Sequence, residues 1–248
     1  MKAMGFARRA VTLSAMTALV LSPALLSAAK VRRSTRSKKA PQVHAQVVDF
    51  FAGRNAGKIE VQFIPKNARQ ATVKIKNKTD KPISIKLPEA FAAVPTAVLA
   101  QIGGMGGGGG GMFNLEPSRE RKIKVETLCL EEGKKDPTPR MKYTMIPIER
   151  FTKQQDVIEL CKMVGNGQVP RNSAQAAAWH LTDKLSWWEL ANKDRIRLSN
   201  GYFRRYFSPR EIGYAIRIAN EAVRRGQQSQ RSSLASDDVA KLESLSNQ

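Results

Sequence analysis

Apolar residues repeat with one spacing in the first half of this chain and with another in the second half, and these two spacings limit the folds that it can adopt. Between residues 59 and 126, apolar side chains alternate with polar ones in short runs, which is typical of strands with one buried face. From Phe151 onward, the spacing of apolar residues lengthens to that of helices. The alternating positions are Ile59, Val61 and Phe63; Val73 and Ile75; Ile83, Ile85 and Leu87; and Ile123 and Val125.

A sheet with one apolar face needs a second layer to cover that face. The sequence therefore predicts an α+β fold, in which an antiparallel β-sandwich-like module at residues 43–148 is followed by a helical module at residues 149–226. Residues 77–82 (NKTDKP) form a turn-like cluster between two alternating runs, which favours an antiparallel hairpin of those two strands.

Helix boundaries are marked by capping residues in the second half of the chain. Ser186 and Ser208 are each followed three residues later by a glutamate, and a proline follows Ser208 directly, so both serines predict helix starts. Gly226 predicts the end of the last helix. Residues 227–248 are rich in serine and glutamine, and we expect a disordered polar tail there.

A glycine run from residue 103 to residue 111, interrupted by Met105 and closed by Met112, looks like a linker. Strand-like alternation resumes at Lys122, however, so we expect residues 103–112 to be a long loop inside the sheet module. A phosphate-binding loop would need a lysine and a serine or threonine at a helix start, and Phe113 and Asn114 follow the run instead.

The first 29 residues are typical of a secretory signal peptide. Positive charges precede an apolar stretch at residues 11–26, and small residues follow at 27–29. A retained membrane anchor is the alternative, but the apolar stretch is short and Pro23 interrupts it. We therefore expect export, to the periplasm, cell surface or exterior, after cleavage near Ala29.

Positive charge dominates the chain, whose 248 residues carry a formal net charge of +21. Such a charge favours an anionic neighbour, and export would make chromosomal nucleic acid an unexpected one. We expect an anionic envelope polymer or a membrane surface; the sequence identifies no protein partner. Residues 30–42 predict a basic disordered arm that either contacts this surface or is a solvated leader. Its basic residues are Lys30, Arg32, Arg33, Arg36, Lys38 and Lys39.

Catalytic patterns are missing from the sequence. His44 and His180 are the only histidines, no cysteine and histidine cluster has zinc spacing, and no G-x-S-x-G string occurs. We expect no catalytic residue, no metal and no cofactor, and hence no enzyme. A secreted hydrolase whose site assembles only on folding is a weaker alternative.

Two cysteines, Cys129 and Cys161, are the whole thiol content of the chain. In an exported protein they could form a disulfide that closes a loop of about thirty residues and contributes roughly 3 to 4 kcal/mol of stability. Two free buried thiols are the other outcome.

Cys129 also belongs to a second motif. The string LCL at residues 128–130, together with AQAAAW at residues 174–179, resembles the cysteine and glutamine motifs of bacterial surface thioester domains. Leu128 and Ala174 stand where that family has an aromatic residue and a threonine. The resemblance implies an internal thioester between Cys129 and Gln175, which an amine or hydroxyl group of a target would open, so that the protein acts as a covalent adhesin.

The mature chain as a whole resembles exported, uncharacterised proteins of planctomycete-type bacteria. These share a string like residues 77–82, a Cys-Leu-x-x-Gly-Lys string and a tryptophan-bearing helical end. The resemblance implies a compartment and an architecture, and no activity.

Aromatic residues gather in the last third of the chain, where they either build the helical core or form a surface for a sugar or a partner. Arg204 and Arg205, next to Phe203 and Tyr206, could stack on an anionic or aromatic partner. Taken together, the sequence predicts an exported, non-catalytic binding or structural protein of the cell envelope or extracellular space, with the thioester adhesin as the alternative.

Overall fold

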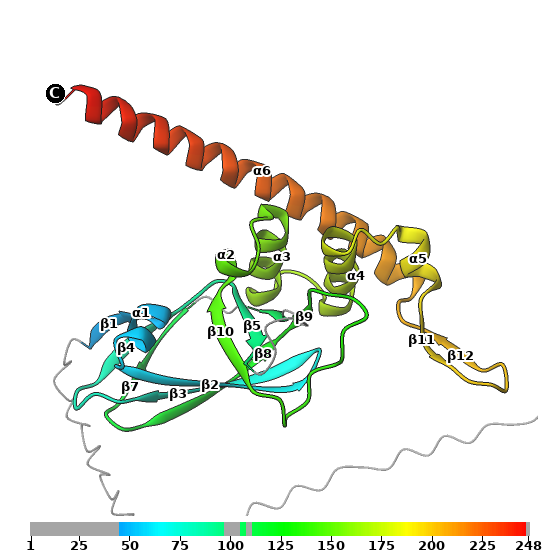
Figure 1. Ribbon diagram of the computed structural model, residues 1–248, viewed down its shortest axis with the longest axis horizontal. Helices are drawn as coiled ribbons and strands as arrows, with labels where there is room; N and C mark the ends of the chain where they lie inside the picture. The colour runs from blue at the N-terminus through cyan, green and yellow to red at the C-terminus, as the bar shows by residue number, and fades with distance from the viewer. Residues whose placement is uncertain (1–44, 97–104, 108–110, 247–248) are drawn as a thin grey trace, which may run out of the picture. The chain divides into compact units, whose positions relative to one another are not determined.

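The computed structural model describes residues 45–96, 105–107 and 111–246, and it has the mixed α+β fold that the periodicity predicts (Figure 1). Two sheets form the first part, helices follow, and a separate two-stranded hairpin is inserted before the last helix. The predicted signal peptide and basic arm lie outside the described residues. In the part of the chain that is described, no helix has the length and apolar character needed to cross a bilayer.

The larger sheet has seven strands in the order β8-β3-β2-β10-β5-β6-β9, and neighbouring strands are antiparallel. Strand β9 is therefore an edge strand. The strands are β2 (Ile59–Asn67), β3 (Gln70–Asn77), β5 (Phe91–Pro95), β6 (Met105–Gly107), β8 (Glu120–Glu126), β9 (Leu128–Cys129) and β10 (Tyr143–Pro147).

The smaller sheet has three strands, in which β4 lies between a parallel partner and an antiparallel one. Its strands are β1 (Gln46–Asp49), β4 (Ile83–Leu87) and β7 (Gly111–Leu115). Helix α1 (Phe50–Asn55) begins directly after β1, where the Asp49 carboxylate accepts hydrogen bonds from two backbone N–H groups. Phe50, Ile75 and Ile85 come from α1 and from both sheets and share one buried cluster, as sandwich-like packing requires.

The predicted hairpin of residues 73–76 with residues 83–87 is wrong. Strand β3 pairs with β2 and β8, whereas β4 pairs with β1 and β7 in the other sheet. Asn77 explains the change of sheet, because its buried side chain donates to the carbonyls of Lys81 and Leu115 and accepts from Thr79. The turn-like cluster is thus a corner between two sheets.

The expected loop at residues 103–112 is wrong for the described part of the glycine run, which forms strands. Gly106 and Gly107 belong to β6 and pair with β5, and Gly111 begins β7. The described part of the run therefore supplies one strand to each sheet, while residues 103–104 and 108–110 lie outside the described residues. Glycines have no side chain, so these strand pairs show no alternation of apolar and polar residues that could be recognised in the sequence.

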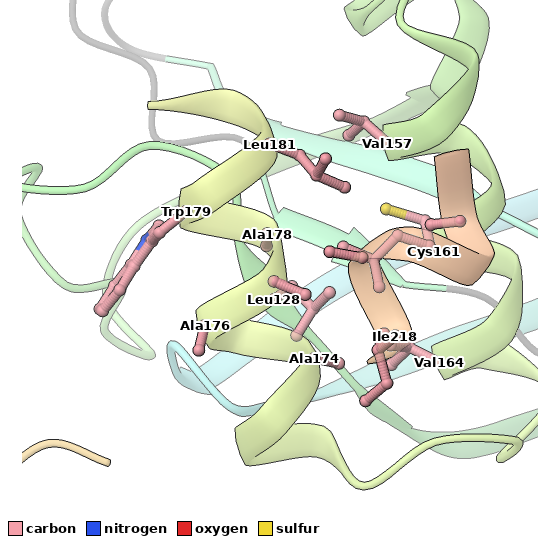
Figure 2. Packing of buried hydrophobic residues seen from close by; sticks show 14 of the residues in the cluster. Leu128, Val157, Cys161, Val164, Ala174, Ala176, Ala178, Trp179, Leu181 and Ile218 are labelled. Carbon is pink, nitrogen blue, oxygen red and sulfur yellow. The ribbon is translucent and has the colours of Figure 1, made fainter. Parts of the chain in front are cut away.

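Five helices follow: α2 (Ile148–Phe151), α3 (Gln155–Gly165), α4 (Arg171–Thr182), α5 (Trp187–Asn192) and α6 (Pro209–Ser246). The two predicted serine caps are confirmed, since the hydroxyls of Ser186 and Ser208 each accept from the N–H of the glutamate three residues later. Helices α3, α4 and α6 surround a second buried cluster (Figure 2), which also contains Ala92 of β5 and Leu128 of β9. Helices and sheet thus share one core.

The expected helix end at Gly226 is wrong, and so is the disordered tail, because α6 continues to Ser246. Gly226 lies where α6 passes the start of α3. A Cβ atom at this position would lie 2.8 Å from the backbone nitrogen of Asp156 and 3.0 Å from the carbonyl carbon of Gln155. Close helix contact, rather than helix termination, accounts for this glycine.

Replacing Gly226 with alanine should therefore lower the free energy of unfolding by about 1 to 3 kcal/mol, because the added methyl group meets backbone that cannot rotate away. Gly213 is the matched control, since it lies in the same helix and a Cβ there has no neighbour within 4 Å. Gly213→Ala should raise stability by about 0.5 to 1 kcal/mol. Urea unfolding followed by circular dichroism measures both values, and equal effects would contradict the contact.

The sequence did not predict the hairpin of β11 (Asp194–Arg197) and β12 (Phe203–Arg205), which lies between α5 and α6. The signal was present, because Asn200 and Gly201 form an Asn-Gly pair, a strong hairpin indicator.

Candidate functional site

The candidate site lies where helix α4 meets the edge strand β9. Arg171, Gln175 and Trp179 are spaced by four residues and so occupy one face of α4. Residues 174–178 are buried and mostly alanine, which favours a helix that can approach the sheet closely. This face of α4, which carries Arg171, Gln175 and Trp179, packs against Cys129 and the residues next to it.

Gln175 joins the two elements. Its side chain is fully buried, its Oε1 accepts a 2.9 Å hydrogen bond from the Cys129 backbone N–H, and its Nε2 donates a 2.7 Å hydrogen bond to the Cys129 carbonyl. The other side of this strand pairs with β6. The carboxamide therefore pairs with the outer edge of β9 as a neighbouring strand would, and satisfies backbone groups that would otherwise be buried without partners.

Arg171 holds the same carboxamide from the other side. Its Nη2 donates to Gln175 Oε1 at 2.8 Å and to the Ala68 carbonyl at 2.7 Å, and its Nε donates to the Thr127 carbonyl at 2.8 Å. Burial lowers the pKa of Arg171 to about 10, and the neighbouring Arg69 acts in the same direction. The guanidinium is still charged at neutral pH, so a cation lies against the Gln175 carbonyl.

This arrangement polarises the Gln175 amide. Its carbonyl oxygen accepts from one backbone N–H and one guanidinium, the two kinds of donor that stabilise negative charge on oxygen during acyl transfer. The amide carbon is therefore more electrophilic than that of a solvated glutamine. One of the two donors is the backbone N–H of Cys129, so the polarised amide is hydrogen-bonded to a residue that carries a thiol.

The Cys129 thiol is half-buried and donates a 3.0 Å hydrogen bond to the Glu131 carbonyl. Burial raises the pKa of the thiol, and the negative charges of Asp136 and Asp183 add to this effect. The Trp179 indole N–H acts in the opposite direction and lowers the pKa of the thiol, although it lies beyond hydrogen-bond distance. At neutral pH, Cys129 is therefore a protonated thiol whose reactivity depends on losing a proton to a base.

Unpartnered polar atoms surround this junction. Four buried side-chain polar atoms of the described residues make no hydrogen bond, and three of them belong to Glu131, Arg171 and Trp179. Folded proteins rarely leave such groups unpaired, and exceptions call for an explanation. These three residues are the ones that pack around Cys129 and Gln175.

Cys161 lies in different surroundings. It is fully buried on α3 among apolar side chains, and burial raises its pKa to about 12. Figure 2 shows Cys161 and Trp179 on opposite sides of α4. Both cysteines are free thiols, so the structure does not contain the bond between Cys129 and Cys161 that the sequence left open.

Other candidate residues have simpler roles or lie outside the described residues. The His180 ring stacks on Trp187 at 4.0 Å, and its Nδ1 lies 2.8 Å from the Leu185 carbonyl, so it belongs to the helical packing. His44 and the basic residues of the predicted arm are outside the described ranges. Within those ranges, no group of three or more His, Cys, Asp or Glu side chains could hold a metal ion.

Arg171 was not among the residues that the sequence singled out. Its position four residues before Gln175 places it on the same helix face, and that spacing was the available signal. Its acceptors come from residues 68 and 127, which only folding brings together. Comparison of the chain with protein-family models, with curated proteins and with solved structures finds no match.

Proposed function

We propose that this protein is an exported binding protein that attaches to its target covalently, through an internal thioester formed between Cys129 and Gln175. One observation carries the proposal. The buried Gln175 carboxamide accepts from the Cys129 backbone N–H at 2.9 Å and donates to the Cys129 backbone carbonyl at 2.7 Å, while Arg171 also donates to its carbonyl oxygen. The leader pattern at residues 1–29 supports export.

The chemistry requires no group from outside the chain to form the thioester. The Cys129 sulfur, on losing its proton, attacks the Gln175 amide carbon, and the oxygen that becomes negative stays bonded to the two donors. The carbon–nitrogen bond then breaks, and the nitrogen leaves as ammonia with the proton from the thiol. A carbon–sulfur bond remains.

A target amine would complete the reaction. Its nitrogen attacks the same carbon, the carbon–sulfur bond breaks, and the Cys129 thiol regains a proton while an amide joins the protein to its target. Each molecule reacts once. The protein is therefore a binder and not a catalyst, which agrees with the non-catalytic role expected from the sequence.

The test is the intact mass of the secreted mature protein. We expect a mass lower than the sequence value by one ammonia, and treatment with methylamine should then add the mass of one methylamine. Cys129→Ala and Gln175→Glu should show no ammonia loss, whereas the control Cys161→Ala should still show it. A loss of two hydrogens that a reductant restores would indicate the disulfide instead, and full mass in every sample would refute the thioester.

A non-covalent role is the second candidate, and the charge of the chain favours it. On the outer face of the larger sheet, Glu120 lies 3.2 Å from Lys74 and 3.8 Å from Lys122, and the neighbouring Lys124 makes no ion pair among the described residues. In this case Gln175 only clamps the helix to the sheet, and the protein is a structural or binding component held by anionic polymer. Retention on immobilised heparin should then fall steeply with salt, and salt-independent retention would contradict it.

A further inference from the structure

The β11–β12 hairpin extends from the helices as a narrow ribbon (Figure 1), and its strands make extensive contacts only with each other. Its tip is closed by a 2.8 Å hydrogen bond from the Leu198 N–H to the Tyr202 carbonyl. Gly201 has a φ of +84°, which a side chain rarely tolerates, so the tip is a defined turn. An isolated two-stranded hairpin has little stability of its own, so contact with another surface would stabilise this one.

Apolar side chains of the hairpin are open to water. Leu198 is 50% exposed, and Tyr202 and Phe203 are both 52% exposed. These are three of the seven large hydrophobic residues that are exposed in the described parts of the chain, although the hairpin is only twelve residues long. Such a concentration marks an interaction surface.

The strand register divides these side chains between two faces. Ile196 is opposite Arg204, and Leu198 is opposite Tyr202, so an apolar face carries one arginine. The other face carries Arg197 opposite Phe203, with Arg205 lying over the Phe203 ring at 5.0 Å. Both faces combine apolar and positively charged groups.

The hairpin carries four arginines and only one acidic residue. Its one acidic residue, Asp194, accepts from Arg197 at 2.7 Å and from Arg205 at 3.0 Å, and its other two arginines are Arg195 and Arg204. Arg195 lies over the Tyr206 ring, and Arg204 has no ion pair among the described residues. The hairpin therefore has the charge that complements an anionic surface.

We propose that this hairpin docks on an anionic phospholipid bilayer. Leu198 and Tyr202 enter the interface between headgroups and acyl chains, while Arg204, which lies on the same face, contacts a lipid phosphate. A soluble anionic polymer would satisfy the arginines but offers no apolar phase for Leu198. This inference does not rest on the thioester.

The experiment measures binding of the full mature chain to vesicles that contain phosphatidylglycerol and to vesicles of phosphatidylcholine alone. We expect tighter binding to the anionic vesicles. The double variant Leu198→Ser, Tyr202→Ser should bind them about tenfold more weakly, because it removes the apolar contribution of two side chains. Arg204→Gln should bind about fivefold more weakly through loss of one charge near the surface.

Two control variants lie away from the hairpin. Met112→Ser removes a 64% exposed apolar side chain from β7, and Lys78→Gln removes a charge from a side chain that is 50% exposed just after β3. Both should bind within twofold of the unchanged protein. Because every variant keeps the basic residues 30–42, their contribution cancels in the comparison.

Three outcomes would overturn the proposal. Equal binding to anionic and neutral vesicles would remove the role of charge, and hairpin variants that bind like the controls would remove the role of the hairpin. If sedimentation instead shows self-association that the double variant abolishes while vesicle binding is unchanged, the hairpin is a protein contact. Circular dichroism of each variant verifies that the fold is retained.

Discussion

Replacement of Arg171 by methionine is expected to lower the free energy of unfolding by about 2 to 4 kcal/mol, because buried carbonyl groups would lose their hydrogen-bond donor. The guanidinium donates to the carbonyls of Ala68 and Thr127 and to the side chain of Gln175, all within 2.8 Å. Methionine has a similar length but no N–H group. The acceptors on three separate segments would then stay buried and partly unsatisfied.

Urea unfolding at neutral pH measures this loss. Arg119→Met is the matched control, since Arg119 is exposed and its side chain takes part in none of the site contacts, and we expect a change within about 0.5 kcal/mol. A change of the same size in both variants would show that Arg171 is not a buried anchor. If the thioester forms, Arg171→Met should also reduce the ammonia loss, because one of the two donors to the Gln175 carbonyl is gone.

Alkaline pH is expected to destabilise the fold through Cys161. Burial raises the pKa of this thiol to about 12 in the folded protein, whereas an unfolded cysteine has a pKa of about 8.5. Above about pH 8.5 the unfolded chain loses the proton and the folded protein keeps it, so the unfolded state is favoured as pH rises. The contribution is absent below that pH and reaches about 2 to 3 kcal/mol near pH 10.5.

Comparison with Cys161→Ala isolates this contribution, because lysines and tyrosines also titrate in the alkaline range. The variant should be less stable at neutral pH, since it loses buried volume beside Val157 and Leu181 (Figure 2). Between about pH 8 and about pH 10.5, however, it should lose about 2 to 3 kcal/mol less than the unchanged protein. Equal losses in the two proteins would mean that the Cys161 thiol is not held in its neutral form by burial.

Both predictions concern the junction between the helices and the larger sheet. Gln175 and Arg171 attach α4 to the edge of that sheet, and Cys161 packs on α3 in the core that α4 shares. The candidate site is therefore part of the structure that joins the two halves of the protein. Stability measurements on site variants are needed beside mass measurements, so that loss of the fold is not mistaken for loss of chemistry.

Local sequence was sufficient for the fold class, the confirmed serine caps and part of the site. Alternation of apolar residues depends on the two-residue repeat of a strand, and the caps at Ser186 and Ser208 depend on residues three positions apart. The strings around Cys129 and Gln175 are each short, but they were paired only through their resemblance to the motifs of thioester domains. The alternation and the caps depend only on residues close in sequence, so they can be recognised without knowledge of the fold.

Strand partners and burial depended on contacts between distant segments. Residues 77–82 look like a hairpin turn. The buried Asn77 side chain, however, donates to the Leu115 carbonyl, and the chain continues into the other sheet. Gly226 looks like a helix end, yet it is where α6 passes the backbone of α3. Arg171 looks like an ordinary surface arginine, and it becomes a buried anchor only because the carbonyls of Ala68 and Thr127 fold against α4 and accept from it. In each case the decisive partner is remote in sequence, and packing alone brings it into contact.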